Sequence, residues 1–448
     1  MLLRSFSDLC SVSSVKEISL KEINRLAIPA IIAGISEPLI SLADTAIVGH
    51  LGSLQLGAVG IASGLFLLFV WTLSSMKSAI SSIVAQYVGR GALKEVATLV
   101  PQSIVFALLI GLLITAATIP FSEVILHEFY RADGKLLNES VLYYNIRAWG
   151  YAFSLATLTI FGVYRGCQNT SWAMRISLVG GVLNLVLDYV LVYGLGPIDS
   201  MGVAGAAYAT LVAQMLMFLL ACLVLWRRFS ESYRFDWKLN TEFRKLLGMF
   251  LNLFLRTIFL NVAYSLAIRY STSYGSKQVA AHTIAMNIWL FSAFFIDGYA
   301  NAGNALAGRL FGSGNSKELR RVGLRIARIS VWIGAALGLV YVLLFPVLGE
   351  VFSNDGEVIS HFESILLYVC FSQPINGVSF SLDGIFKGLG RASLLRNTLF
   401  LGTFLVFVPV LLLTDYLQWG LHAVWSAFVC WMIFRGWSLL YVFRRDYR

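Results

Sequence analysis

Residues 180–194 read GGVLNLVLDYVLVYG, an apolar run that contains Asn184 and, one helical turn later, Asp188. An ionised carboxylate in such a run costs several kcal/mol unless it has a partner or takes up a proton. Similar runs of about 20 apolar residues recur along the chain, and this length crosses roughly 30 Å of hydrocarbon. The sequence therefore predicts an all-α polytopic membrane protein in which Asp188 lies inside a transmembrane helix.

The composition agrees with this class of protein. Of 448 residues, 58% are hydrophobic and 13% are charged, with a mean hydropathy of +0.75. A soluble domain carries about 25% charged residues. The net charge of +10 could reflect either a nucleic-acid partner or membrane topology, and the distribution of the basic residues between predicted loops distinguishes the two.

Hydropathy predicts twelve spans: 26–48, 57–80, 96–119, 140–163, 176–194, 202–225, 246–268, 279–305, 329–349, 362–386, 398–415 and 421–441. Of the 34 Lys and Arg residues, 26 then fall in the two termini and in alternate loops. The positive-inside rule places both termini in the cytoplasm. The basic charge thus reflects membrane topology, and we expect no nucleic-acid partner.

The chain contains an internal repeat. YVGRGALKEV (87–96) aligns with LFGSGNSKEL (310–319) at an offset of 223, and GVYRGCQNTS (162–171) aligns with GIFKGLGRAS (384–393) at an offset of 222. Similar loops at a nearly constant offset predict two six-helix lobes related by a parallel pseudo-two-fold repeat. The predicted parts are a cytoplasmic segment (1–25), an N-lobe (26–225), a cytoplasmic linker (226–245), a C-lobe (246–441) and a cytoplasmic tail (442–448).

The two repeats differ in their polar residues. Asn184 and Asp188 share one face of span 5, whereas Val406 and Val410 occupy the equivalent positions of the second repeat. A purely structural device would be expected in both copies. Isolated carboxylates inside a membrane mark a proton or ion pathway, so we predict such a pathway in the N-lobe.

Span 1 carries further candidates. Glu37 and Asp44 are seven residues apart and project from one helix face, and Pro29 lies in the same helix and is predicted to kink it. The alternative for Asp188, Asp44 and Glu37 is a fixed ion pair, for instance with Arg147 in span 4 or Lys77 in span 2.

The C-lobe has fewer charged positions within spans. Arg256 and Asp297 are secondary candidates that could neutralise each other as a structural pair, and Asp383 is expected to cap or pair locally. The sequence contains no nucleotide-binding, zinc-protease or nucleophile-elbow motif. Its five cysteines and five histidines lack the spacing of metal ligands. We therefore expect no enzymatic activity, no cofactor and no bound metal.

Several stretches together resemble the multidrug and toxic compound extrusion (MATE) family, in particular its DNA-damage-inducible, DinF-like branch. The resemblance covers nearly the whole chain and is carried by EPLISLADTAIVGHLG (37–52), VAQYVGRG (84–91), GGVLNLVLDYVLVYGLG (180–196), GVAGAAYAT (202–210), DGYANAGNALAGRLFG (297–312) and LDGIFKGLGRASLLRN (382–397). It implies twelve helices in two lobes around a central cavity.

The resemblance also implies site residues. Asp44 matches the span 1 aspartate of the family, and Asn184 and Asp188 match its span 5 Asn-x-x-x-Asp, which together bind the coupling cation. Pro29 matches a proline at which the helix bends. Residues near positions that line the substrate path or its polar network are Glu37, Tyr143 and Thr210.

The function implied is export of organic cations and other amphipathic drugs in exchange for protons or sodium through alternating access. Because the carboxylates are free to take up a proton, we expect proton antiport, by a monomer in the plasma membrane in contact with membrane lipid. Sodium is the alternative coupling ion, because one amide and two carboxylates could ligate it. A sodium-coupled exporter of organic anions is also open. A flippase for lipid-linked precursors is disfavoured, because only Arg147, Arg256 and Lys77 could provide a cationic cavity.

Overall fold

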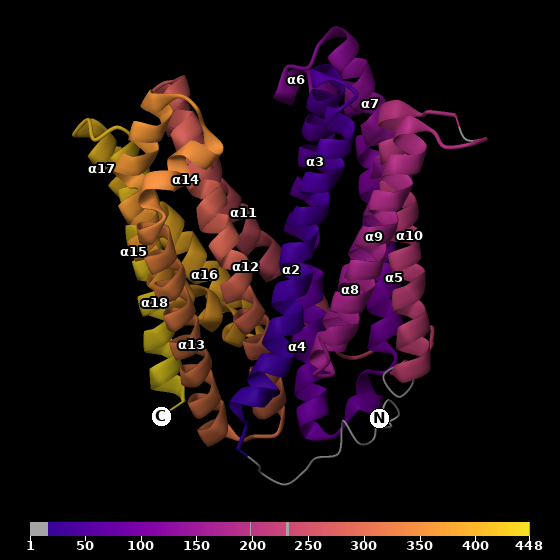
Figure 1. The fold of residues 1–448 in the computed structure, drawn as a ribbon. Helices are drawn as coiled ribbons and strands as arrows, with labels where there is room; N and C mark the ends of the chain where they lie inside the picture. The colour runs from indigo at the N-terminus through magenta and orange to yellow at the C-terminus, as the bar shows by residue number, and fades with distance from the viewer. Residues whose placement is uncertain (1–16, 198, 230–232, 448) are drawn as a thin grey trace. The chain divides into compact units, whose positions relative to one another are not determined.

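The computed structural model describes residues 17–197, 199–229 and 233–447, without the side chains of residues 36–43 and 346. The described chain is nearly all helical (Figure 1). Its helices in the first part of the chain are α2 (Leu20–Gly49), α3 (Ser53–Leu73), α4 (Ser75–Arg90), η1 (Leu93–Val96), α5 (Leu99–Thr118), α6 (Ser122–Tyr130), α7 (Gly134–Ala148), α8 (Gly150–Gly166), α9 (Ser171–Tyr193) and α10 (Gly202–Arg228).

The second part of the chain continues with α11 (Phe243–Ser273), α12 (Ser276–Gly312), α13 (Ser316–Leu343), α14 (Phe345–Phe352), α15 (Gly356–Gly388), α16 (Ala392–Leu401), the π-helical segment η3 (Gly402–Phe407), α17 (Val408–Tyr416) and α18 (Leu421–Asp446).

Among the described residues, ten helical segments are long and apolar enough to cross a membrane, or eleven if α7 and α8, bent by 45°, form one span. Helix α2 occupies the first predicted span in addition. The predicted fold class, twelve helices in two repeats, is confirmed. Helices extend beyond the predicted spans: α13 begins at Ser316, whereas the ninth predicted span begins at residue 329, because helices continue beyond the hydrocarbon into water, where charged residues are tolerated.

Contacts divide the chain into two compact units. Of the described residues, one unit comprises those within 32–246, and the other comprises 17–31 together with 247–447. The division passes through α2 between Ile31 and Ile32, just after Pro29. The first part of α2 thus packs with α11–α18. The predicted lobe limits at 26–225 and 246–441 concern membrane topology and stay a prediction.

Each unit contains the same close helix contact at glycine. In the first unit, a Cβ on Gly162 would lie 2.4 Å from the carbonyl oxygen of Lys77, so α8 approaches α4 closely. In the second, a Cβ on Gly384 would lie 2.2 Å from the carbonyl oxygen of Ala300, between α15 and α12. These positions are separated by 222 and 223 residues, the offsets of the sequence repeat. Both contacts require glycine, because any side chain would push the helices apart.

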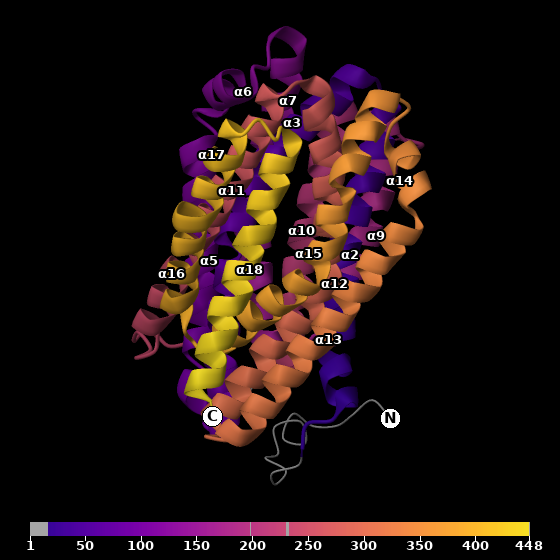
Figure 2. The ribbon, with the colours of Figure 1, turned by 90° about the vertical axis from the view of Figure 1, so that its left-hand side faces the viewer.

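Helix α15 is the centre of the second unit. It packs against α12, α13 and α18 (Figure 2). Its fully buried Phe362 belongs to an aromatic core that also contains Trp289, Trp425 and Trp431. This packing places α11, α15 and α18 side chains near one another, although they lie far apart in sequence.

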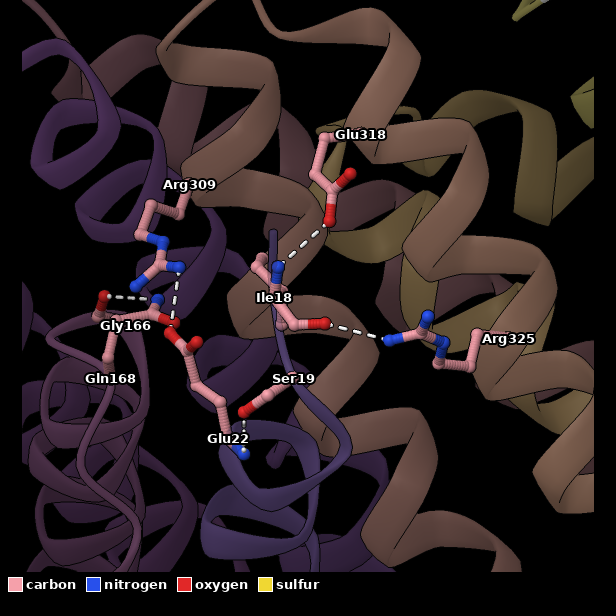
Figure 3. A network of polar contacts seen from close by, with 8 residues as sticks. All are labelled: Ile18, Ser19, Glu22, Gly166, Gln168, Arg309, Glu318 and Arg325. Carbon is pink, nitrogen blue, oxygen red and sulfur yellow. Dashed lines mark hydrogen bonds and ion pairs between the residues drawn. The ribbon is translucent and has the colours of Figure 1, made fainter. Parts of the chain in front are cut away.

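Hydrogen bonds and an ion pair connect the segment before α2 and the first turn of α2 to α12 and α13 of the same unit (Figure 3). The Ile18 amide donates to Glu318 Oε1 at 2.9 Å, and Arg325 Nη1 donates to the Ile18 carbonyl at 2.8 Å. Arg309 Nη2 pairs with Glu22 Oε1 at 2.9 Å. The start of α2 is therefore held by both main-chain and ionic contacts.

Candidate functional site

Helix α9 turns its polar residues inward and its apolar residues outward. Val182 and Val186 are 63% and 54% exposed, whereas Asn184 and Asp188 are 6% and 1% exposed. Its buried residues are Ile176, Gly180, Gly181, Asn184, Asp188 and Val192. This arrangement suits a lipid-facing helix, whose exposed side chains meet hydrocarbon rather than water.

Three of the predicted residues meet within the first unit. Asn184 Nδ2 donates to Asp188 Oδ2 at 2.8 Å. The Asp44 and Asp188 carboxyl groups lie close enough to interact with each other. No described donor reaches Oδ1 of either aspartate. Asp44, half-buried on the second part of α2, and Asp188, buried on α9, thus form an acid pair that Asn184 supplies with one hydrogen bond.

Arg147 forms a second polar group next to this pair. It is 9% exposed, and its Nη1 donates to Tyr143 Oη at 2.6 Å and to Thr210 Oγ1 at 3.5 Å. Its guanidinium carbon lies 4.6 Å from the ring centre of Phe66. Tyr143 also accepts from Ser63 Oγ at 3.3 Å. The predicted lining residues Tyr143 and Thr210 are therefore joined through Arg147.

Arg147 interacts with the acid pair at longer range only. Among the described residues, Asp188 forms no ion pair with Arg147 or Lys77, although Arg147 attracts both aspartates electrostatically. The alternative in which Asp188 is held in a fixed ion pair does not occur in this structure.

The remaining N-lobe candidates lie on α2. Pro29 is half-buried, and α2 is helical through it from Leu20 to Gly49. The side chain of Glu37 lies outside the described part of the structure. Gln214 on α10 was not selected from the sequence, yet it is 8% exposed and its Oε1 has no hydrogen-bond partner among the described residues. A lone amide in an apolar helix was the signal that could have identified it.

In the second unit, Arg256 pairs with Asp383. Arg256 Nε and Nη2 donate to Asp383 Oδ1 at 2.9 and 2.8 Å. Lys387 Nζ lies 2.6 Å from Asp383 Oδ2, one turn along α15. Asp383 thus has the expected local partner and a second one 127 residues away, which spacing alone could not predict. Asp297 acts on Lys387 and Arg435 electrostatically.

With this geometry established, comparison with known proteins identifies the family. The MatE family model matches residues 29–190 and 253–413, two segments that begin 224 residues apart and end 223 residues apart. The chain belongs to the MatE family. The resemblance inferred from its motifs is thereby confirmed, and the matched segments coincide with the two repeats.

This MatE protein is similar to curated relatives over most of its length. It is 28% identical over 435 residues to the DNA damage-inducible protein F of Escherichia coli, covering 96% of this chain and 93% of that protein. It is 27% identical to Protein DETOXIFICATION 44, chloroplastic, of Arabidopsis thaliana, covering 92% and 80%.

Solved structures share the fold. A transporter of the MOP superfamily from Pyrococcus furiosus, described as having a binding pocket of reverse polarity, has a TM-score of 0.89 at 22% identity and covers 99% of this chain and 98% of its own. A structure described as MATE in the bent conformation has a TM-score of 0.87 at 24% identity, with 95% of both chains covered. The fold is thus shared over nearly the whole chain.

Proposed function

We propose that the chain is a secondary active multidrug efflux transporter that exports amphipathic organic cations from the cytoplasm in exchange for protons. The observation that supports this most is that Asp44 interacts with the buried Asp188, to which Asn184 donates a hydrogen bond. Relatives named as multidrug resistance proteins support the substrate class, for example the probable multidrug resistance protein NorM of Thermotoga maritima, 24% identical.

The acid pair can couple transport because its charge is variable. Two adjacent carboxylates out of water cannot both ionise at low cost, so one proton shared between them satisfies both free oxygens. Loss of that proton leaves negative charge, which water, Arg147 or a cationic drug must offset. A cationic drug and a proton then compete for the same charge, and this competition is the coupling free energy.

Pro29 and Asp44 lie on the same helix, so protonation or deprotonation of Asp44 can change how far α2 bends at Pro29. Proline removes one main-chain hydrogen bond and makes the helix easier to bend. The boundary between the two compact units lies within α2, just after Pro29, which supports a hinge at this point. Alternating access would follow from two shapes of α2 with different proton occupancy.

A proton suits the site better than sodium. Hard cations prefer several oxygen ligands, whereas Tyr143 Oη and Thr210 Oγ1 both accept from Arg147. The positive charge of Arg147 would also repel a second cation. Among the described residues, no group of three or more His, Cys, Asp and Glu side chains has the spacing of a metal site.

The proposed setting is the plasma membrane, with both termini in the cytoplasm and the transporter acting as a monomer. The basic residues of the predicted cytoplasmic loops support this orientation.

The experiment that tests the function uses purified protein in liposomes. Ethidium, an amphipathic cation, should trigger proton release under an imposed pH gradient, and replacing sodium with choline should not change the rate. If ethidium flux requires sodium and does not depend on the pH gradient, the coupling ion is sodium and not the proton. No ethidium-dependent flux of either ion would refute the antiport proposal.

A further inference from the structure

The second unit contains a buried cluster with more cations than carboxylates. Arg256 on α11, Asp383 and Lys387 on α15 and Arg435 on α18 form this cluster. Asp383 is its buried acid, and both carboxylate oxygens are already used, Oδ1 by Arg256 and Oδ2 by Lys387. Arg435 therefore has no share in the ion pairs of the cluster.

Arg435 is left without an adequate acceptor. It is 2% exposed, its Nη1 donates to the Met432 sulfur at 3.2 Å, and its Nη2 has no hydrogen-bond partner among the described residues. The guanidinium carbon lies 4.8 Å from the ring centre of Trp431 and 5.8 Å from that of Phe380. A thioether is a weak acceptor, and burying a cation without a paired acceptor is costly.

The other repeat shows how this chain satisfies a buried arginine that serves structure. Arg165, aligned with Lys387 in the sequence repeat, is 4% exposed. Its Nε donates to Ser81 Oγ at 2.9 Å, and its Nη2 donates to the Lys77 carbonyl at 3.1 Å. Hydroxyl and carbonyl oxygens thus hold a buried guanidinium in the first unit. Nothing equivalent holds Arg435.

We propose that Arg435 anchors an anion site in the second unit, which binds the carboxylate of an amphipathic organic acid. A guanidinium presents two parallel N–H groups that match the two oxygens of a carboxylate. Trp431 and Phe380 provide apolar faces beside the charge for the hydrocarbon part of the ligand. The inference deepens the proposed efflux function by adding a second class of substrate.

The charges of the cluster also set the preferred ligand charge. Arg256, Lys387 and Arg435 provide three positive charges, against one on Asp383 and one on the exposed Asp297. One net positive charge remains, which favours a monocarboxylate over a dicarboxylate. Arg435 is covered in this structure, so binding requires the cluster to open, and the exposed Asp297 beside the cluster and the half-buried Lys387 within it mark the side from which a ligand enters.

Binding is measured on the purified full-length protein through thermal unfolding, since a ligand that binds the folded state raises Tm with its concentration. The probes are 1-naphthoate, its uncharged analogue 1-naphthamide and naphthalene-1,4-dicarboxylate. We expect 1-naphthoate to raise Tm in a saturable way, the dicarboxylate to bind at least threefold more weakly and the amide to have no saturable effect.

Two variants separate a ligand site from a structural role. Arg435→Gln should keep or raise the Tm of the ligand-free protein, because it removes a buried cation that lacks an acceptor, and should weaken 1-naphthoate binding at least tenfold. Arg165→Gln, the matched control, should lower the Tm of the ligand-free protein and leave the affinity for 1-naphthoate unchanged.

The proposal is overturned if the wild-type protein does not distinguish 1-naphthoate from the amide, or if Arg435→Gln binds it with unchanged affinity. A ligand-free Tm that falls in Arg435→Gln as far as in Arg165→Gln would show that Arg435 serves structure. Ethidium–proton exchange is measured on the same preparations. Failure of that exchange would refute the antiport proposal and leave the carboxylate binding result standing, and the reverse also holds.

Discussion

Replacing Asp188 by Asn removes the variable charge of the acid pair and leaves its shape. The Asn184 amide, which donates to Asp188 Oδ2 at 2.8 Å, can donate to the new amide oxygen instead. No buried cation is stranded, because Asp188 forms no ion pair with Arg147 or Lys77 among the described residues. We therefore expect a folded protein that can no longer exchange a proton at this position.

The expected effects are large for transport and small for stability. Breaking a buried ion pair costs about 3–5 kcal/mol, which would lower Tm by roughly 6 to 20 °C for units of about 200 residues. We expect a Tm change below about 4 °C, because the hydrogen bond to Asn184 is kept. An imposed gradient of one pH unit can sustain about a tenfold ethidium ratio if one proton is exchanged, and about a hundredfold ratio if two are. The Asp188→Asn ratio should be near one.

The assay measures Tm and ethidium accumulation on the same purified variant. Asp44→Asn should lose accumulation as well, and the double variant should lose no more, because the two carboxyl groups act as one unit. Val406→Ile and Val410→Ile, at the equivalent positions of the second repeat, are the matched controls and should transport normally. A stable Asp188→Asn protein that accumulates ethidium like wild type would refute the reasoning.

Three further outcomes are expected. Pro29→Ala should leave expression and Tm unchanged or higher but reduce ethidium efflux, since alanine restores a main-chain hydrogen bond and favours one shape of α2; full efflux would make the proline a static feature. Arg321 holds the pKa of Glu17 below its ordinary value. Their contact therefore stabilises the N-terminal segment fully at pH values above the ordinary pKa of Glu17, and this stabilisation is lost as the pH falls through the lowered pKa. Arg321→Gln should accordingly speed proteolysis before α2 at pH 7 and have a smaller effect as pH falls below the ordinary pKa of Glu17, and an equal effect at every pH would contradict this. Cysteines introduced at Lys238 and Asn354 should react with an impermeant reagent from inside and outside the cell respectively, and the opposite pattern would overturn the topology.

The fold could be predicted because membrane helices are determined mainly by local composition. A run of apolar residues shows where a helix crosses, and the repeat at offsets of 222 and 223 relates the halves. Hydropathy says less about where a helix ends, because helices continue in water. Helix α12 therefore extends to Gly312 and α13 begins at Ser316, both within the segment expected to be a loop.

From the sequence, only the part of the site that lies on a single helix could be predicted. The spacing of Asn184 and Asp188 places both on one buried face, as observed. The contact of Arg147 with Thr210 joins helices 63 residues apart in sequence, and no local pattern indicates it. Arg147 was considered as a partner of Asp188, but the structure places it with Tyr143 and Thr210 instead.

The two repeats share the close glycine contact and differ in how their acids are satisfied: in the first unit Oδ1 of Asp44 and of Asp188 lacks a described donor, whereas in the second both oxygens of Asp383 are paired with cations. The first unit buries carboxyl groups, whose charge disappears when a proton binds. The second buries the guanidinium of Arg435, which stays charged at any physiological pH and can be neutralised only by another group. A proton can therefore satisfy the pair Asp44 and Asp188, whereas Arg435 requires an anion. If both units take part in transport, the first unit responds to pH and the second to the charge of the substrate. An organic cation would then bind near Asp44 and Asp188, and an organic acid would bind at Arg435.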